Sequence, residues 1–306
     1  MQECLIKPNE KLMDITDDTV FKFMLTMNTK ESKETLRLLI SAFIGKKVKH
    51  VSIKENEPQT GNSKQKHCRL DVNCMLDGNR FANVEMTMEV KDSEFVRIEH
   101  YWMLMGASRN TEGIAYEDFP DVYQISFLGE GNLSGDNEPI NRHGVCNLRT
   151  KMHMNTKGHI ITAELNKLKD KIKSVETLNE AQRWAAYIAW VNDKSKINLV
   201  NELIKKDGGL QMATNALRQA TDNQLLQMEL NSKKKLRDIE FNRMFYAKKE
   251  ARAEGKAEGK AEGKAEGRYE ERNIMAIKMI SENEDLNKIS RYTGLSIEEI
   301  KNLSAD

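Results

Sequence analysis

Apolar and polar residues alternate with two different spacings over the first 170 residues, and each spacing predicts one type of element. Helical spacing occurs in TVFKFMLTM, directly after Asp17-Asp18, and in ETLRLLISAFIG, which ends at Gly45. A third helix is predicted from about Ser93 to Met105. Strands are predicted at Val48 to Ile53, in both arms of RLDVNCMLDGNRFANVEMTMEV (Arg69 to Val90), at Val122 to Leu128, at Met152 to Asn155 and at His159 to Leu165. A loop is predicted from Gly129 to Gly144, and the order predicts an α/β or α+β domain that ends near residue 170.

The segment RLDVNCMLDGNRFANVEMTMEV has the pattern of a β-hairpin around an Asp-Gly-Asn loop. If that loop has three residues, Val72 lies opposite Val84 and Asp71 lies opposite Glu85. A shift by one residue would pair Asp71 with Val84 and mix the two faces, so burial favours the first register. The Cβ atoms of Asp71 and Glu85 are then expected roughly 5 Å apart on the polar face.

Two carboxylates at this separation repel each other, and one pKa rises unless a cation lies between them. Mg²⁺ fits such a pair because it prefers carboxylate oxygens, keeps several waters and commonly bridges to phosphate. A bound divalent ion can lower the pKa of a water for attack on a phosphodiester. The alternative is an ordinary pair of acids on an exposed sheet face.

After residue 170 the pattern is helical. AQRWAAYIAWV places Trp184, Ile188 and Val191 on one face, which indicates core packing. The run SKKKLRDIEFNRMFYAKKEAR has eight basic and three acidic residues, a net charge of +5, with aromatic residues between them. It is either a solvated helix face or a contact for nucleic-acid phosphates. Its candidate phosphate ligands are Lys233, Lys234 and Lys235.

The segment from Ala253 to Arg268 repeats Ala-Glu-Gly-Lys with a period of four. On a helix this period stacks Glu over Glu and Lys over Lys at i,i+4, and each Gly costs up to about 1 kcal/mol relative to Ala. An isolated single helix is therefore not expected. Self-association of two copies and a semi-flexible linker remain the two alternatives.

The last segment, from Tyr269 to Asp306, has the apolar spacing of a helix-turn-helix around TGLS. It has five basic and eight acidic residues, a net charge of −3. Phosphate would repel a recognition helix of that sign, so a packing or oligomerisation module is expected rather than a DNA reader.

The composition narrows the class of protein further. A net charge of +1 over 306 residues gives no global field that attracts nucleic acid. The four cysteines have no zinc-like spacing, and reduced thiols are expected. No signal-peptide pattern and no stretch of 18 apolar residues occur, so a cytoplasmic protein that does not cross a membrane is expected.

DDTVFK, LDV, NVEM and RIEHY occur in this order, followed by a helical region and Glu-Gly-Lys repeats. This ordered set resembles the recombination-promoting nucleases and the PD-(D/E)xK nuclease family transposases, from about residue 12 to the end. The resemblance implies an α/β fold with a restriction-endonuclease-like core, a mixed sheet flanked by helices, and a helical C-terminal extension. It also implies a Mg²⁺-dependent DNA endonuclease of mobile-element recombination or defence, with DNA as its partner. The expected divisions are residues 1–170 (nuclease-like domain), 171–252 (helical region with the basic segment), 253–268 (repeat) and 269–306 (helix-turn-helix-like module).

The resemblance also implies roles for individual residues. Asp71 and Glu85 would hold the metal. Asp18 would be an additional ligand or simply the N-terminal cap of its helix. Arg97 and Tyr101, one helical turn apart, would hold a phosphate or brace the carboxylates.

One departure from the family pattern concerns the position two residues after Glu85. The family has Lys or Gln there to act on the attacking water, whereas this chain has the shorter, uncharged Thr87. Lys22 or Lys91 are the candidates to supply the missing charge. Glu89-Val90-Lys91 is a second Glu-x-Lys. Glu89 and Lys91 are expected on the same strand face as Glu85, but too far along it to combine with Asp71. Two hypotheses therefore remain open: an active endonuclease in which Thr87 or a nearby Lys orients the water, or a degenerate DNA-binding or self-assembling scaffold.

Overall fold

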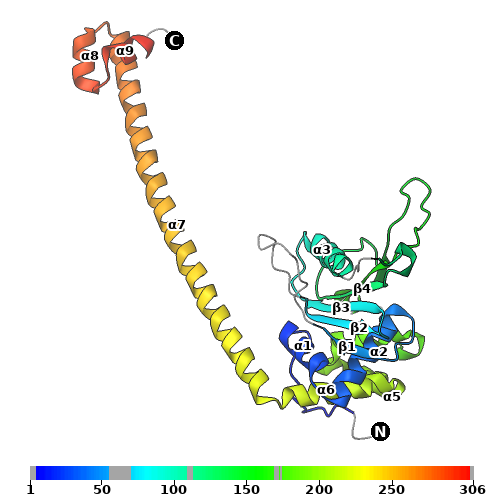
Figure 1. Cartoon of the computed structure of the whole chain (residues 1–306). Helices are drawn as coiled ribbons and strands as arrows, with labels where there is room; N and C mark the ends of the chain where they lie inside the picture. The colour runs from blue at the N-terminus through cyan, green and yellow to red at the C-terminus, as the bar shows by residue number, and fades with distance from the viewer. Residues whose placement is uncertain (1–4, 55–69, 109–112, 169–171, 173, 304–306) are drawn as a thin grey trace. The chain divides into compact units, whose positions relative to one another are not determined.

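A computed structural model gives the structure of the chain (Figure 1). It describes residues 5–54, 70–108, 113–168, 172 and 174–303. The chain divides into two compact units, Met1–Leu230 and Asn231–Asp306. Cys74 and Cys146 are free thiols, and Cys4 and Cys68 lie outside the described residues.

A mixed sheet forms the centre of the first unit, and its described strands have the order β1-β2-β3-β4-β6-β5. The strands are β1 Val51–Ile53, β2 Val72–Leu76, β3 Arg80–Thr87, β4 Val122–Leu128, β5 Ile140–His143 and β6 Gly158–Glu164. Strands β1, β2 and β3 are antiparallel, β3, β4 and β6 are parallel, and β5 is antiparallel to β6. This mixed sheet flanked by helices confirms the predicted fold class (Figure 1).

Two N-terminal helices, α1 (Asp18–Thr26) and α2 (Lys30–Ile44), cover the apolar face of the sheet. Val84, Ile125 and Ile161 lie side by side on β3, β4 and β6 and are fully or almost fully buried. The ring of Phe127 on β4 meets rings from both helices edge-on, with centroids 5.5 and 4.9 Å away. Gly45 ends α2 with a left-handed φ of 71°, as predicted.

Three further helices complete this core: α4 (Glu180–Trp190), α5 (Ile197–Lys206) and α6 (Gly208–Thr221). Both α4 and α6 contact α2. Trp184 and Ile188 are buried in the core, as their helical spacing predicted.

The other face of the sheet lies under α3 (Glu94–Ala107). A small apolar cluster holds α3 to the sheet through Ile98, Leu128 and Ile160. The rest of this face is polar because every second strand residue points toward it. Its buried polar residues are Asn73, Asn83, Glu85, Gln124, Ser126, Thr162 and Glu164. The candidate site is on this face.

Two expected elements differ from the structure. The segment from Met152 to Asn155 is not a strand and makes only an isolated bridge between Cys146 and His153. Strand β5 lies inside the predicted loop, because its polar sequence INRH pairs with β6 although its own propensity for strand is low.

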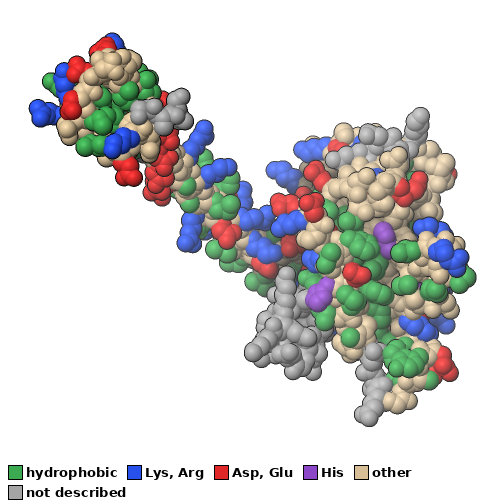
Figure 2. All heavy atoms as spheres, turned by 90° about the horizontal axis from the view of Figure 1, so that it is seen from above, with side chains coloured by type: hydrophobic (Ala, Val, Ile, Leu, Met, Phe, Trp, Pro, Cys, Tyr) green, Lys and Arg blue, Asp and Glu red, His purple; other side chains and the backbone are tan. Residues whose placement is uncertain are grey.

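A helix of 58 residues, α7 (Gln224–Ser281), includes the whole four-residue repeat. The expectation that the repeat is not a single helix is therefore wrong. In each Ala-Glu-Gly-Lys unit, three of the four residues are good helix formers. The helical segments on both sides of the repeat also remove the cost of nucleating a helix. Figure 2 shows acidic and basic side chains along this helix.

Two short helices follow, α8 (Leu286–Thr293) and α9 (Ile297–Leu303), with a left-handed Gly294 between them. Ile289, Leu295 and Ile300 are buried together with Ala276 of α7, which confirms the predicted helix-turn-helix spacing. Among the described residues, no helix has both the length and the apolar character that a membrane span requires.

Candidate active site

The hairpin has the predicted register. Val72 pairs with Val84 and Asn73 with Asn83, so the next position outward brings Asp71 opposite Glu85. Asp71 lies in a bend just before β2, where its carboxylate accepts a hydrogen bond from the backbone N–H of Met86. This bond holds Asp71 against the strand that carries Glu85.

The charge of Asp71 affects the protonation of Glu85. Burial, and then the negative charge of Asp71, raise the pKa of Glu85 to about 8 from its usual 4.5, against the opposing charge of Arg97. Burial also raises the pKa of Asp71, and the charge of Lys22 on α1 is the largest influence that lowers it. The charge of Asp18 adds to the rise in the pKa of Asp71, whereas that of Arg97 lowers it. The two carboxylates thus form a close pair that favours a proton or a cation.

Arg97 is the positive charge that contacts this pair. Its Nη1 lies 3.4 Å from Glu85 Oε2, and its Nη2 donates a 2.6 Å hydrogen bond to Thr87 Oγ1. Its Nε donates a 3.0 Å bond to Glu94, which is buried at the start of α3. The guanidinium also lies over the ring of Tyr101, 5.3 Å from the centroid. Arg97 is therefore fixed in place beside Glu85.

A row of polar side chains continues from Glu85 across the sheet. Asn83 Nδ2 donates to Glu85 Oε1 at 2.8 Å and to Gln124 Oε1 at 3.0 Å, and Gln124 Nε2 donates to Ser126 Oγ at 3.1 Å. The sequence interpretation missed Gln124, Ser126 and Glu94. The alternation of Gln and Ser with large apolar residues in VYQISFL is the signal that could have identified the first two.

Two oxygens of this row are buried without a hydrogen-bond partner among the described residues: Oε2 of Glu85 and Oδ1 of Asn83. Buried oxygens of this kind normally have partners, and both are of the type that Mg²⁺ prefers. The pair Asp71 and Glu85, with the Asn83 oxygen nearby, therefore fits a divalent cation that keeps part of its water shell.

Asp18 does not complete a three-ligand set. The described residues contain no cluster of three or more His, Cys, Asp or Glu side chains suited to a metal. Asp18 is exposed at the first position of α1. It is also not the helix cap: Asp17 is, because its Oδ1 accepts from the N–H groups of Thr19 and Val20.

The second Glu-x-Lys lies outside the strand. β3 ends at Thr87, and Glu89 and Lys91 are exposed in the bend and loop that follow. The expectation that they share a strand face with Glu85 is wrong, because the ladder ends at the point where the chain turns toward α3. The exposure of Glu89 and Lys91 agrees with the prediction that Glu85, and not Glu89, belongs to the site. Lys22 is close enough to act on the charge of Asp71.

The remaining predicted residues are Lys233, Lys234 and Lys235. They are part of α7 in the second unit, and their side chains are half-buried to exposed.

A family model described as PD-(D/E)XK nuclease family transposase matches residues 15–243. The chain belongs to the PD-(D/E)XK nuclease family transposases. The match includes the hairpin, α3 and the first part of the basic run on α7, and it ends before the four-residue repeat. No curated protein matches the chain, and neither does any solved structure. Membership of this family supports a nuclease-like function, and nucleases of this kind typically use divalent metal ions.

Proposed function

We propose that this PD-(D/E)XK family member is a cytoplasmic, Mg²⁺-dependent DNA endonuclease that hydrolyses phosphodiester bonds in mobile-element recombination or defence. One observation carries the proposal: the buried Glu85 carboxylate, with an unbonded Oε2, lies against both Asp71 and the guanidinium of Arg97. On a plain sheet face, a buried carboxylate oxygen would normally have a hydrogen-bond partner.

Asp71 and Glu85 would hold the metal, and the Asn83 amide oxygen lies next to them. When bound, the cation lowers the pKa of a water and offsets charge on the phosphate. Asp18 would act from farther away, through the negative charge that it adds near Asp71. Ionised Glu85 is the form that binds the cation, so loss of its proton accompanies binding.

The residues around this pair would orient the substrate. Arg97 would contact the scissile phosphate through Nη1, and Thr87 fixes the direction of the guanidinium. Tyr101 packs beneath Arg97, and Lys22 on α1 compensates the charge of Asp71. Lys91, together with Lys233, Lys234 and Lys235, would contact the DNA backbone, where each phosphate contact adds to a salt-dependent affinity.

Nicking of supercoiled plasmid tests the proposal. The parent chain is expected to nick in Mg²⁺ or Mn²⁺, and Asp71→Ala and Glu85→Ala are expected to lose the activity. Glu89→Ala is the matched control, because Glu89 is a nearby exposed acid that needs no partner in this mechanism. Nicking that persists in both Asp71→Ala and Glu85→Ala would contradict the site.

A degenerate scaffold of the same fold is the second candidate, and the uncharged Thr87 favours it. It predicts no nicking by the parent in either metal, together with a gain of nicking in Thr87→Lys or Thr87→Gln. DNA binding by the parent would then persist without cleavage.

A further inference from the structure

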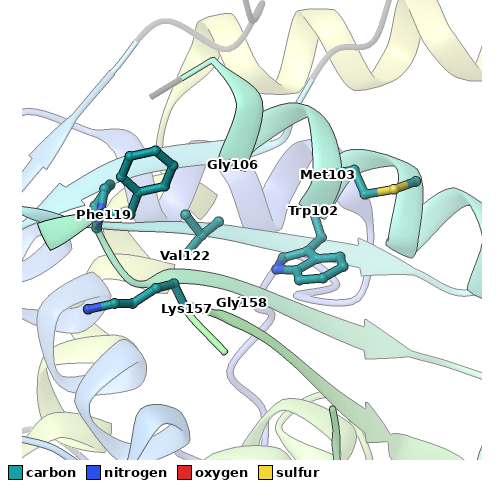
Figure 3. A pocket seen from close by; sticks show the side chains of 8 residues that line it. Trp102, Met103, Gly106, Phe119, Val122, Lys157 and Gly158 are labelled. Carbon is teal, nitrogen blue, oxygen red and sulfur yellow. The ribbon is translucent and has the colours of Figure 1, made fainter. Parts of the chain in front are cut away.

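A pocket of about 250 Å³ lies on the same sheet face as Glu85, toward the other end of β4 (Figure 3). Val122 forms part of its floor and shares a strand face with Ser126, the residue paired with Glu85. Val122 and Ser126 are four positions apart along the strand, about 13 Å. The pocket and the acid pair therefore lie along one surface under α3.

Two aromatic side chains form opposite walls of this pocket. Figure 3 shows Trp102 of α3 and Phe119 on either side of Val122. The indole of Trp102 lies directly on Gly158 of β6: a Cβ at Gly158 would be 1.9 Å from the ring. Glycine at this position is what allows the indole to lie against the sheet and leave the pocket open.

A positive charge completes the lining. Lys157, next to Gly158, is exposed and contributes to the pocket wall. Trp102 and Phe119 are only partly buried, so a ligand can reach both rings. Aromatic faces beside a lysine are the combination that binds a nucleobase by stacking and its phosphate by charge.

We propose that this pocket holds one unpaired nucleobase of the DNA strand that is cut. This inference rests on the proposed nuclease function and names its substrate class: DNA with an unpaired nucleotide a short distance from the scissile phosphate. A base inside a duplex is stacked on both faces and must leave the stack to enter a pocket. A short run of nucleotides covers the roughly 13 Å of strand between Val122 and Ser126, the residue paired with Glu85.

Tryptophan fluorescence tests the pocket without any need for cleavage. The chain has three tryptophans, and Trp184 and Trp190 are only 2% exposed, so Trp102 is the one that a ligand can quench. The full chain is titrated with single-stranded oligothymidylate and, separately, with the same strand annealed to its complement. The experiment uses Asp71→Ala/Glu85→Ala as background, so that the DNA stays intact.

We expect the single strand to quench the emission, and Trp102→Phe to lose that response. Phe119→Ala and Lys157→Ala should weaken binding of the single strand about tenfold, because stacking and phosphate contacts are lost. Lys157→Ala is a surface change that preserves folding. Tyr292→Ala, which removes an exposed aromatic side chain on α8, should change nothing.

Equal quenching by the duplex, undiminished quenching in Trp102→Phe, or unchanged affinity in both Phe119→Ala and Lys157→Ala would each overturn the inference. Failure of the nuclease proposal is seen separately, as absence of plasmid nicking by the parent. Quenching without nicking would support the pocket as a base-binding site on a chain that does not cut.

Discussion

The hydroxyl of Thr87 accepts a 2.6 Å hydrogen bond from Nη2 of Arg97, while Nη1 of the same guanidinium lies 3.4 Å from Oε2 of Glu85. The side chain two residues after Glu85 therefore positions a cation from α3 instead of carrying the charge itself. In combination, Thr87 and Arg97 place a positive charge where the family pattern has Lys or Gln.

The first prediction concerns variants that move this positive charge from residue 97 on α3 to residue 87 on β3. Arg97→Met is expected to lower the nicking rate on the order of 100-fold, the typical effect of losing one donor to a developing charge. Arg97→Met/Thr87→Lys should recover part of that loss, because the strand then carries its own cation. Initial rates of plasmid nicking measure both variants, and Arg149→Met, an exposed arginine, is the control. A double variant no faster than Arg97→Met would refute the exchange.

The second prediction concerns pH. The pKa of Glu85 is raised from 4.5 to about 8, so the neutral carboxyl predominates at neutral pH in the metal-free protein. Its contribution to the free energy of unfolding is complete below about pH 4.5 and is lost as the pH rises through about 8. Metal affinity should show the opposite trend and increase from pH 6 to 8, with release of a proton at pH 7. Titration calorimetry in two buffers of different ionisation enthalpy counts that proton, and Glu85→Gln should release none.

The third prediction separates the adjacent acids at the start of α1. Asp17→Ala removes two hydrogen bonds to helix N–H groups and should lower the free energy of unfolding by about 1 kcal/mol. Asp18→Ala should cost less stability but weaken metal binding, because it removes a negative charge near Asp71 that would attract the cation. Urea unfolding and metal titration of both variants measure the difference. Equal loss of stability in the two would contradict the assignment of Asp17 as the cap.

The fourth prediction uses Gly158. A methyl group there would lie within the Trp102 indole, so Gly158→Ala should move the ring and lower the free energy of unfolding by about 1–3 kcal/mol. Gly106→Ala is the matched control, because the added Cβ meets nothing within 4 Å. Alanine also has a higher helix propensity than glycine, so this exchange should not lower the free energy of unfolding. Thermal unfolding of the two variants provides the comparison, and a stable Gly158→Ala would show that Trp102 has room to move.

The fifth prediction addresses self-association through α7. This helix exposes large apolar side chains on both sides of the repeat, among them Phe241, Met244, Ile274 and Ile277. A homo-oligomer would cover them. We expect light scattering to give a multiple of the chain mass for the full protein and a monomer after truncation at Lys249. Truncation at Arg268 keeps the repeat and removes the end of α7. It tests whether self-association needs any residue after the repeat. An unchanged number of copies per particle after truncation at Lys249 would exclude the part of α7 that follows Lys249 as the contact.

The register of the hairpin could be predicted from the sequence because burial sorts side chains by face. Only one pairing of Val72 and Asp71 with the partner strand leaves the core uniformly apolar. Strand β4 and the end of α2 were predictable for a similar reason: local pattern and packing agree in VYQISFL and at Gly45. Strand β5 was not, since its pairing with β6 is a long-range interaction that INRH does not encode locally.

The composition of the site was predictable only in part. Asp71, Glu85 and Arg97 lie within short motifs, and the structure brings them together. The contact between Thr87 and Arg97 depends on how α3 folds back over the strand, which no local spacing specifies. The positions of Glu89 and Lys91 were wrongly expected because strand alternation holds only as far as the ladder extends, and β3 ends at Thr87.

The two acids are held with different rigidity. Glu85 lies inside the ladder of β3, between β2 and β4, whereas Asp71 lies in a bend just before β2 begins. If the two acids hold a cation as proposed, a shift of Asp71 would accommodate an ion of larger radius while Glu85 keeps its place. Discrimination between Mg²⁺, Mn²⁺ and Ca²⁺ would then depend mainly on how far the backbone at Asp71 can adjust.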